Sequence, residues 1–262
     1  KYYEKSLNSK ATVILINKTV PCPKGKALII SDDPFRDFNT LTTNFKPFHP
    51  SSQAISDTST IGNKTIIQPN CFIGNHVQIG ENCIIHANVS IFDDTIIGDN
   101  VVIQSGSVLG TNAFYYKKRP EGYDQLRSSG RVVIKDHVHI GASCTIDRGV
   151  TGDTTIGKGT KLDNLIQVGH DTLIGSNCLI ASQCGIAGCC IIEDDVTIWG
   201  QVGTNSGITI GAGAVILGQS GVTKSVEGGK TYFGTPIEES RSKFKELALL
   251  RKLPEIIKEL KE

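Results

Sequence analysis

Residues 61–103 read IGNKTIIQPNCFIGNHVQIGENCIIHANVSIFDDTIIGDNVVI, and a branched apolar residue returns at every sixth position. The spacing continues to Leu109, resumes at Ile134 and, after a four-residue slip in DRGVTGDT (147–154), runs on to Val222. Glycine often follows the branched residue, as in IGNHVQ and IGENCI. A period of six differs both from the roughly 3.6-residue period of an α-helix and from the two-residue alternation of a half-buried strand.

The six-residue period fits a triangular solenoid in which three hexads make one coil. Each coil places one short strand on each of its three sides with the branched residue inward, and stacked coils pair strand on strand in parallel. One coil cannot bury its own apolar face, so the fold requires a stack, here of roughly seven or eight coils. We therefore predict a mainly β protein, a parallel β-helix. Thr204 stands where the repeat expects an aliphatic residue.

Segments outside the repeat divide the chain further. The apolar stretches ATVILI and KALIIS flank a Pro-rich turn and predict a small α/β domain. After Pro236 the apolar spacing becomes helical, and Pro254 is expected to begin a second short helix. Because the chain starts at Lys1 and contains no Met, we expect the first domain to be N-terminally incomplete. The predicted organisation is a small domain at 1–46, a linker at 47–60, the β-helix at 61–236 with a loop insertion at 111–131, and a helical extension at 237–262.

Composition excludes several classes of function. The 27 basic residues nearly balance the 26 acidic ones, so the net charge gives no attraction to nucleic acid or to anionic membranes. No apolar run approaches the roughly 20 residues of a membrane span, so we expect no stable membrane insertion. The eight cysteines lack the spacing of a dense disulfide framework or of a CxxC motif. We expect them to be reduced and packed, with zinc binding as the lesser alternative, which favours a cytoplasmic protein.

Several short motifs, together with the hexads, resemble one family, the UDP-3-O-acylglucosamine N-acyltransferases of lipid A and lipopolysaccharide biosynthesis. They are GRVVI (130–134), TIDRG (145–149), GDTTIGKGTKLDN (152–164), QVGH (167–170), GIAG (185–188), GQSGVTK (218–224) and FGTP (233–236). The resemblance implies a left-handed β-helix, a homotrimer, and a cytoplasmic enzyme of a Gram-negative-type bacterium. It also implies transfer of a 3-hydroxyacyl group from acyl carrier protein to the 2-amine of a UDP-linked glucosamine. The donor is the acyl-phosphopantetheine of that carrier, and no bound cofactor is expected.

His170 is the candidate general base. Forming an amide from a thioester needs a group that takes the amine proton and a donor that stabilises the tetrahedral oxyanion. The resemblance assigns the first role to His170 and the second to the backbone N–H of Gly188. These residues are eighteen positions apart, so we predict that they stack on adjacent coils, roughly 5 Å apart along the axis. Either Asp171 or Asp163 can orient the imidazole, and the sequence does not choose between them.

Substrate contacts are expected from three further residues. The resemblance places Tyr2 of the small domain against uracil, Lys224 near phosphate or pantetheine, and Gly221 beside an open acyl channel. For Tyr2 the plain alternative is a partly packed aromatic side chain of the small domain. The basic residues of 111–131 either receive a diphosphate or the acidic carrier protein, or belong to a solvated loop. His137 and His139 suggest a metal site, but alternate residues on an exposed strand are more often solvated, so we expect no metal.

The sequence also departs from the family pattern. Gly207 stands where many members carry a second histidine in a GH pair, and NAFYY (112–116) replaces the usual central-loop motif. A related hexapeptide acyl- or acetyltransferase that acts on another nucleotide-linked amino sugar is therefore the main alternative. A zinc carbonic anhydrase on this scaffold needs three histidines from neighbouring faces, and the coils after His170 contain none. A non-catalytic scaffold is disfavoured by the DRG, QVGH and GIAG motifs.

Overall fold

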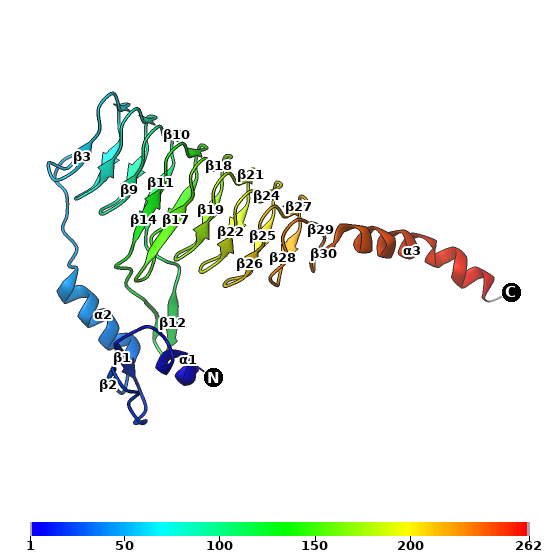
Figure 1. Ribbon diagram of the computed structural model, residues 1–262, viewed down its shortest axis with the longest axis horizontal. Helices are drawn as coiled ribbons and strands as arrows, with labels where there is room; N and C mark the ends of the chain where they lie inside the picture. Colours follow the sequence, from blue (N-terminus) through cyan, green and yellow to red (C-terminus); the bar gives the residue numbers. More distant parts are fainter. Residues whose placement is uncertain (1, 261–262) are drawn as a thin grey trace. The chain divides into compact units, whose positions relative to one another are not determined.

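The computed structural model describes residues 2–260, and the chain forms two compact units. One unit runs to His49 and includes Tyr115–Arg127. The other begins at Pro50, omits that insertion, and contains the repeats and the C-terminal helix. Figure 1 labels the elements of both units, which are described separately below.

The repeat unit consists of three parallel sheets (Figure 1). In spatial order the first contains β4 (Ile66–Ile67), β7 (Ile84–Ile85), β10 (Val102–Ile103), β15 (His139–Ile140), β18 (Lys161–Leu162), β21 (Leu179–Ile180), β24 (Thr197–Ile198), β27 (Val215–Ile216), β29 (Thr231–Phe233) and β30 (Glu238–Glu239). The second contains β5 (Phe72–Ile73), β8 (Ser90–Ile91), β11 (Val108–Thr111), β16 (Thr145–Asp147), β19 (Gln167–Val168), β22 (Gly185–Ile186), β25 (Gly203–Thr204) and β28 (Gly221–Val222). The third contains β3 (Thr60–Ile61), β6 (Gln78–Ile79), β9 (Ile96–Ile97), β14 (Arg131–Ile134), β17 (Asp153–Ile156), β20 (Leu173–Ile174), β23 (Ile191–Ile192) and β26 (Thr209–Ile210). The pairing of β29 with β30 is antiparallel. The predicted parallel β-helix is confirmed.

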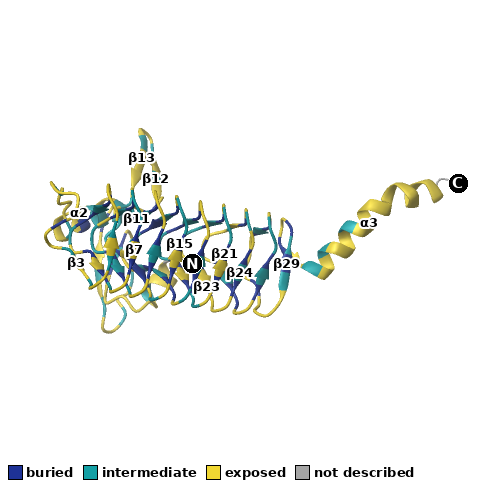
Figure 2. Cartoon of the chain, turned by 90° about the horizontal axis from the view of Figure 1, so that it is seen from above, coloured by how far each residue is buried: buried dark blue, intermediate teal, exposed yellow. Residues whose placement is uncertain are grey.

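The hexad positions form the core of this unit. Val168, for example, lies between Ile146 of the preceding coil and Ile186 of the following one, and all three side chains are at most 1% exposed. Figure 2 shows that buried and exposed residues alternate along the stack. Ile61 is 41% exposed because β3 is the terminal strand of its sheet and has a neighbour on one side only. The repeat therefore predicts which side chain of each strand points inward.

The buried corners carry thiol and hydroxyl groups that bind the backbone of the next coil. The Cys178 thiol donates to the carbonyl of Glu193 (3.1 Å), and the Thr160 hydroxyl donates to the carbonyl of Gly175 (2.7 Å). The same contact recurs from Cys71, Cys83, Cys184 and Cys190 and from Thr65 and Thr172. All eight cysteines are free, and six of them are buried. The expected packing of the cysteines thus holds for these six, which act as small donors to backbone carbonyls.

We expect Thr160→Val to destabilise the protein by about 1–3 kcal/mol and Thr160→Cys to cost much less. Valine leaves two buried groups without a partner, because the Thr160 hydroxyl also accepts from the N–H of Cys178 (3.0 Å). Cysteine keeps a donor, as at the neighbouring corners. Urea unfolding followed by circular dichroism measures both variants. An equal loss in the free energy of unfolding for both variants would show that the side chain at this corner stabilises the protein by its packing and not by its hydrogen bond.

The N-terminal unit is a small α/β arrangement. It contains α1 (Tyr2–Leu7), the parallel strands β1 (Val13–Ile16) and β2 (Ala27–Ile30), and α2 (Pro34–Phe45). The side chain of Asp33 accepts from the N–H of Arg36 at the start of α2, and Pro34 occupies the first turn, where its missing N–H costs nothing.

The loop insertion predicted at 111–131 contains regular structure. Residues Tyr116–Arg119 (β12) and Gly122–Gln125 (β13) form an antiparallel hairpin that belongs to the N-terminal unit. The side-chain amide of Asn39 on α2 donates to the carbonyl of Gln125 (2.9 Å), and its oxygen accepts from the N–H of Arg127 (2.9 Å). The hydrogen bonds of the hairpin and of Asn39 explain why this segment has regular structure.

The C-terminal extension is a single helix, α3 (Ser240–Glu259), and the predicted second helix starting at Pro254 is wrong. Proline removes one N–H donor from the helix interior, yet the helix continues through this residue. Figure 2 shows α3 as largely exposed. Among the described helices, none combines the length and apolar character that crossing a membrane requires.

Candidate active site

His170 lies at the corner that follows β19, and its ring contacts residues of its own coil and of the next one. Its Nδ1 lies 2.8 Å from Oδ2 of Asp171, and its side chain is only 14% exposed. On the other side, a Cβ built on Gly188 would lie 2.5 Å from Nε2. The N–H of Cys189 donates to the carbonyl of His170 (2.7 Å), which joins the two coils at this point. The structure thus brings His170 and Gly188 together, as the eighteen-residue spacing predicts.

A comparison with other corners explains why residue 188 is glycine. At the corresponding positions an acidic side chain one coil later caps a backbone N–H, as Asp194 does for Ser176 (2.7 Å) and Asp93 does for Asn75 (2.8 Å). Gly188 occupies this capping position for His170. Because it lacks a side chain, the imidazole takes the space that the cap fills elsewhere.

The backbone of Gly188 carries the candidate oxyanion donor. Within residues 2–260 its N–H has no hydrogen-bond acceptor, whereas its carbonyl accepts from the Ser206 hydroxyl (2.6 Å) and the N–H of Gly207 (3.1 Å). A Cβ on Gly169 would lie 2.6 Å from this nitrogen, so glycine at 169 also keeps the N–H accessible. A backbone N–H without a protein acceptor is available to an anionic oxygen.

Thr204 is a residue of this site that sequence reasoning did not assign to it. In regular coils the N–H that follows the hexad residue donates to a backbone carbonyl, as Gly175 does to Ile192 (2.7 Å). Next to Gly188, the N–H of Ala187 donates instead to the hydroxyl of Thr204 (2.9 Å). The Thr204 hydroxyl thus replaces one backbone–backbone hydrogen bond between coils, directly beside Gly188. The break in the hexad at Thr204 was the available signal.

Asp171 is the carboxylate that contacts the imidazole. Its Oδ2 also accepts from the N–H of Val150 (2.9 Å), and its Oδ1 accepts from the N–H of Gly152 (3.4 Å). Burial alone would raise the pKa of Asp171, but the hydrogen bonds from His170, Val150 and Gly152 outweigh it and lower the pKa below its usual 3.8. The carboxylate therefore stabilises the folded state at neutral pH, and this contribution is lost as the pH falls below 3.8 through the lower folded-state pKa.

Asp163, the other predicted partner, lies at a different corner. It follows β18 in the first sheet, is exposed, and accepts from the N–H of Asn164 (2.8 Å). His170 follows β19 in the second sheet. Of the two open alternatives, the structure pairs Asp171 with the ring and does not bring Asp163 to it.

A second, more deeply buried carboxylate lies on β16, the strand of the preceding coil that pairs with β19. Asp147 is 8% exposed and accepts from the Thr111 hydroxyl (2.6 Å) and from the side-chain amide of Gln167 (3.0 Å). Burial raises the pKa of Asp147, while Thr111, the nearby His170 and Gln167 partly oppose that shift. Asp147 of TIDRG and Gln167 of QVGH thus belong to one hydrogen-bond network close to His170.

The remaining predicted contacts are placed as follows. The side chain of Tyr2, in α1, is outside the described part of the structure. Lys224 is exposed and pairs with Glu238 (2.9 Å). A Cβ on Gly221 would lie 2.9 Å from the side chain of Thr235, so this glycine accommodates Thr235, and an acyl channel beside it stays a prediction.

The basic residues of the hairpin are engaged within the N-terminal unit. Lys117 (3.0 Å) and Arg119 (2.5 Å) both pair with Asp33, and both cations lie 5.8 Å from the ring centroid of Phe35. The hydrogen bond from Lys117 is the largest cause that holds the pKa of Asp33 well below its usual range, and Arg119 adds to it, although partial burial acts in the opposite direction. Lys117 and Arg119 thus form ion pairs within the unit, and contact of this loop with a diphosphate or with a carrier protein stays a prediction.

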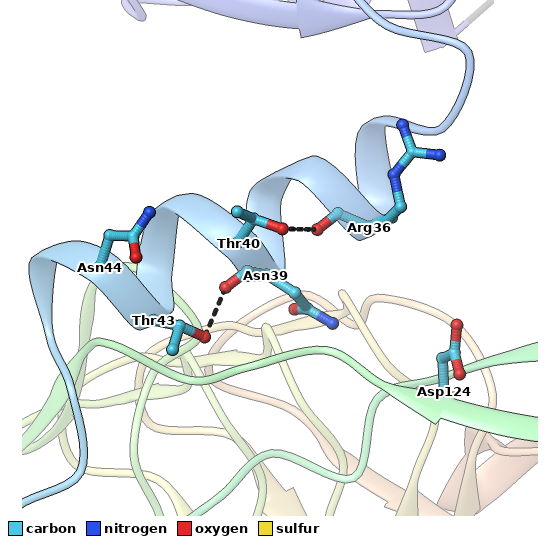
Figure 3. A pocket seen from close by; sticks show the side chains of 6 residues that line it. All are labelled: Arg36, Asn39, Thr40, Thr43, Asn44 and Asp124. Atoms are coloured by element: carbon cyan, nitrogen blue, oxygen red, sulfur yellow. Dashed lines mark hydrogen bonds between the residues drawn. The ribbon is translucent and has the colours of Figure 1, made fainter.

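Figure 3 shows a polar hollow in the same unit, between α2 and β13. It is lined by Arg36, Asn39, Thr40, Thr43, Asn44 and Asp124. The guanidinium of Arg36 is already paired with Asp32 (2.7 Å) and Asp37 (2.8 Å). The hydroxyls of Thr40 and Thr43 are bonded to carbonyls of their own helix. The hollow therefore offers few unpaired groups for a ligand.

We expect Asp171→Asn to lower the kcat of the predicted acyl transfer more than Asp163→Asn does, with a smaller loss than removal of His170, the predicted base, for which general-base catalysis contributes about 10²–10⁴-fold. Asparagine has one acceptor oxygen where the carboxylate has two, so the contacts to Val150, Gly152 and His170 cannot all persist. Steady-state kinetics on both variants separates kcat from KM. A larger loss in Asp163→Asn would contradict the pairing as the functional one.

Comparisons with known proteins agree with this fold. The description "Bacterial transferase hexapeptide (six repeats)" matches residues 58–93 and 153–188, and "Hexapeptide repeat of succinyl-transferase" matches 76–111. Among solved structures, the UDP-N-acetylglucosamine acyltransferases of Bacteroides fragilis and Francisella novicida are each 28% identical. The first has a TM-score of 0.66 and covers 71% of both chains; the second has a TM-score of 0.64 and covers 69% of this chain and 64% of that one.

Curated proteins with similar sequences share one enzyme name. The UDP-3-O-acylglucosamine N-acyltransferase of Methylobacterium sp. (strain 4-46) is 40% identical over 132 residues, and that of Campylobacter lari is 39% identical over 124 residues. The matched stretches are 50% and 47% of this chain, and 38% and 39% of the relatives' own length. The chain is thus a hexapeptide-repeat β-helix protein with curated homologues, at about 40% identity, that are named UDP-3-O-acylglucosamine N-acyltransferases.

Proposed function

We propose that this protein is an N-acyltransferase that moves a 3-hydroxyacyl group from acyl carrier protein to the 2-amine of UDP-3-O-acylglucosamine, in lipid A biosynthesis. The observation that carries the proposal is the position of His170, held at Nδ1 by Asp171 and directed at Nε2 toward Gly188. The names of the curated relatives supply the reaction class. The donor thioester is carried on phosphopantetheine, and the reaction itself needs no bound cofactor.

In the proposed mechanism Nε2 of His170 takes a proton from the 2-amine as its nitrogen attacks the thioester carbonyl. The hydrogen-bond pattern supports this tautomer, because Nδ1–H donates to the ionised Asp171 and leaves the lone pair on Nε2. The tetrahedral oxyanion accepts from the N–H of Gly188. Collapse of the intermediate breaks the C–S bond, and the imidazolium returns its proton to the departing thiolate. The products are the amide and the free thiol of the carrier.

A homotrimer is part of the proposal. Leu173 and Ile191, neighbours on β20 and β23, are 46% and 44% exposed and border a hollow on the outer face of the third sheet. Adjacent exposed aliphatic residues favour burial against another surface. A second copy of the chain is the proposed occupant, with acyl carrier protein and the UDP-sugar as the other partners. A cytoplasmic location follows from these substrates.

Gly207 supports one alternative acceptor. It lies one coil beyond Gly188, and a Cβ built on it would have no atom within 4 Å. The space that a second histidine occupies in many members of the resembled family is therefore open here. A transferase that acts on another nucleotide-linked amino sugar fits this feature.

A substrate assay tests the function and separates the two acceptors. The purified protein receives UDP-3-O-acylglucosamine with hydroxyacyl carrier protein and, in parallel, acetyl-CoA or acyl carrier protein with unacylated nucleotide amino sugars. Amide formation in the first reaction is expected. Product only in the second reaction would establish the alternative, and no product in either would reject acyl transfer.

A further inference from the structure

Three side chains with different metal-binding atoms meet at the catalytic corner. His170, Asp171 and Cys189 each place one such atom so that all three atoms lie within 4.8 Å of one another. We propose that they form a binding site for a thiophilic divalent cation such as Zn²⁺, and that an ion held there switches off the proposed base. The inhibitory half of this proposal rests on the proposed function, whereas the binding half does not.

The donor distances are close to those of a metal site. Nδ1 of His170 lies 2.8 Å from Oδ2 of Asp171 and 4.0 Å from Sγ of Cys189. Zinc bonds of about 2.0 Å to nitrogen or oxygen and about 2.3 Å to sulfur place tetrahedral donors about 3.3–3.6 Å apart. Shifts of about half an ångström bring both distances from Nδ1 into that range, and the remaining distance, between the carboxylate oxygen and Sγ, lies within 4.8 Å. A fourth position stays open for water.

The backbones that carry these side chains are fixed by bonds between coils. The N–H of Cys189 donates to the carbonyl of His170 (2.7 Å), and the N–H of Asp171 donates to the hydroxyl of Thr154 (2.9 Å). Both Cys189 and Asp171 adopt the left-handed conformation of a coil corner, with φ of 61° and 54°. Ligands on rigid elements bind a metal with little loss of conformational freedom.

Cys189 differs from its neighbour in the Cys189–Cys190 pair. Cys190 is buried, and its thiol donates to the carbonyl of Asn205 (3.2 Å). Cys189 is exposed, and its sulfur faces Nδ1 of His170. The adjacent pair thus separates a core thiol from one that a solvent-borne cation can reach. The sulfur also determines the class of ion, because Mg²⁺ and Ca²⁺ prefer oxygen ligands.

Coordination at Nδ1 has a direct chemical consequence. In the proposed mechanism the proton sits on Nδ1, and Nε2 carries the lone pair that accepts the amine proton. A metal on Nδ1 replaces that proton, and a neutral imidazole then carries its hydrogen on Nε2. The ring can no longer act as a base, although the ion lies on the side of the ring away from Gly188.

Cobalt(II) titration without substrate tests the binding half, since a thiolate bound to Co²⁺ gives a near-ultraviolet charge-transfer band. The matched control is Cys22→Ser, which removes the other exposed cysteine, located in the N-terminal unit. We expect the band to saturate at one equivalent in the unaltered chain and in Cys22→Ser, to be lost in Cys189→Ser with about tenfold or more weaker binding, and not to be displaced by Mg²⁺. No band in the unaltered chain, or an unchanged band in Cys189→Ser, would overturn the site.

Zinc inhibition tests the second half in the transfer assay. We expect Zn²⁺ to abolish transfer reversibly, a chelator to restore it, and Cys189→Ser to need about tenfold or more Zn²⁺ for the same inhibition relative to its own metal-free rate. A thiolate band combined with transfer that is insensitive to Zn²⁺ would overturn the inhibitory role. A protein that binds Co²⁺ through Cys189 but transfers no acyl group would reject the proposed function and retain the metal site.

Discussion

Replacing His170 with alanine is expected to reduce acyl transfer by about 10²–10⁴-fold while the β-helix stays folded. The imidazole ring is the group that faces Gly188. The coils that carry these two residues are held together by the stacking of Val168 on Ile186 and by backbone hydrogen bonds between coils. Removing the imidazole therefore deletes the proposed base without removing a core side chain. We expect kcat to fall more than KM rises, because the proton transfer belongs to the transition state.

The matched control for this variant is His137→Ala. His137 also lies at a coil corner, but unlike His170 it has a positive φ (59°) and is exposed, and no Cβ built on a glycine has a His137 atom among its nearest neighbours. Circular dichroism, thermal unfolding and size-exclusion chromatography establish that both variants are folded. Near-normal turnover in folded His170→Ala would refute the base assignment, and a comparable loss in His137→Ala would indicate a general effect of corner histidines.

Gly188→Ala is expected to abolish most activity and to destabilise the protein, and both effects should depend on His170. The added Cβ would lie 2.5 Å from Nε2, 2.7 Å from Cδ2 and 2.9 Å from Cε1 of the imidazole. Gly188 is not among the residues with positive φ, so alanine fits its backbone and the clash is with the ring. The ring must move, and the base loses its position beside the Gly188 N–H.

A double-mutant cycle isolates this clash. In the His170→Ala background the three atoms nearest to the added methyl group are gone, so the stability cost of Gly188→Ala should largely disappear, with a coupling energy of about 1–3 kcal/mol. Gly185→Ala is the control in the same coil, because a Cβ there has no neighbour within 4 Å. Urea unfolding of the set measures the coupling. An equal cost of Gly188→Ala in both backgrounds would show that the glycine is required for a reason other than the ring.

The sequence predicted those parts of the structure that depend on the repeat. A fixed period determines which side chain points inward and which residues of successive coils are neighbours, so the core and the stacking of His170 on Gly188 followed from spacing alone. The choice of Asp171 over Asp163 did not follow from the spacing. It depends on which corner each carboxylate side chain occupies, and on the extra loop at 149–152, whose N–H groups donate to Asp171.

Segments without a period were predicted less well. The hairpin β12–β13 has little apolar alternation, and its pairing with Asn39 of α2 is a long-range contact that no local pattern reveals. Pro254 suggested a helix start, yet the single lost donor did not end α3. The sequence around Cys189 shows no metal-binding motif, because its candidate partners, His170 and Asp171, come from the preceding coil.

The register between coils also restricts which changes in chain length the protein can tolerate. Gln167 pairs with Gly185 and Gly185 with Gly203, so in this uninterrupted part of the stack each strand residue has its neighbour eighteen positions on. Removing one complete coil after residue 207 would leave every remaining pair around His170 in place. Removing a single hexad between His170 and Gly188 would rotate the rest of the stack by one side of the triangle and carry Gly188 to another face. Within the uninterrupted hexads, whole coils are therefore the unit of deletion that preserves the His170–Gly188 corner, whereas an insertion confined to one corner, such as that at 111–131, leaves the pairing of the strands intact.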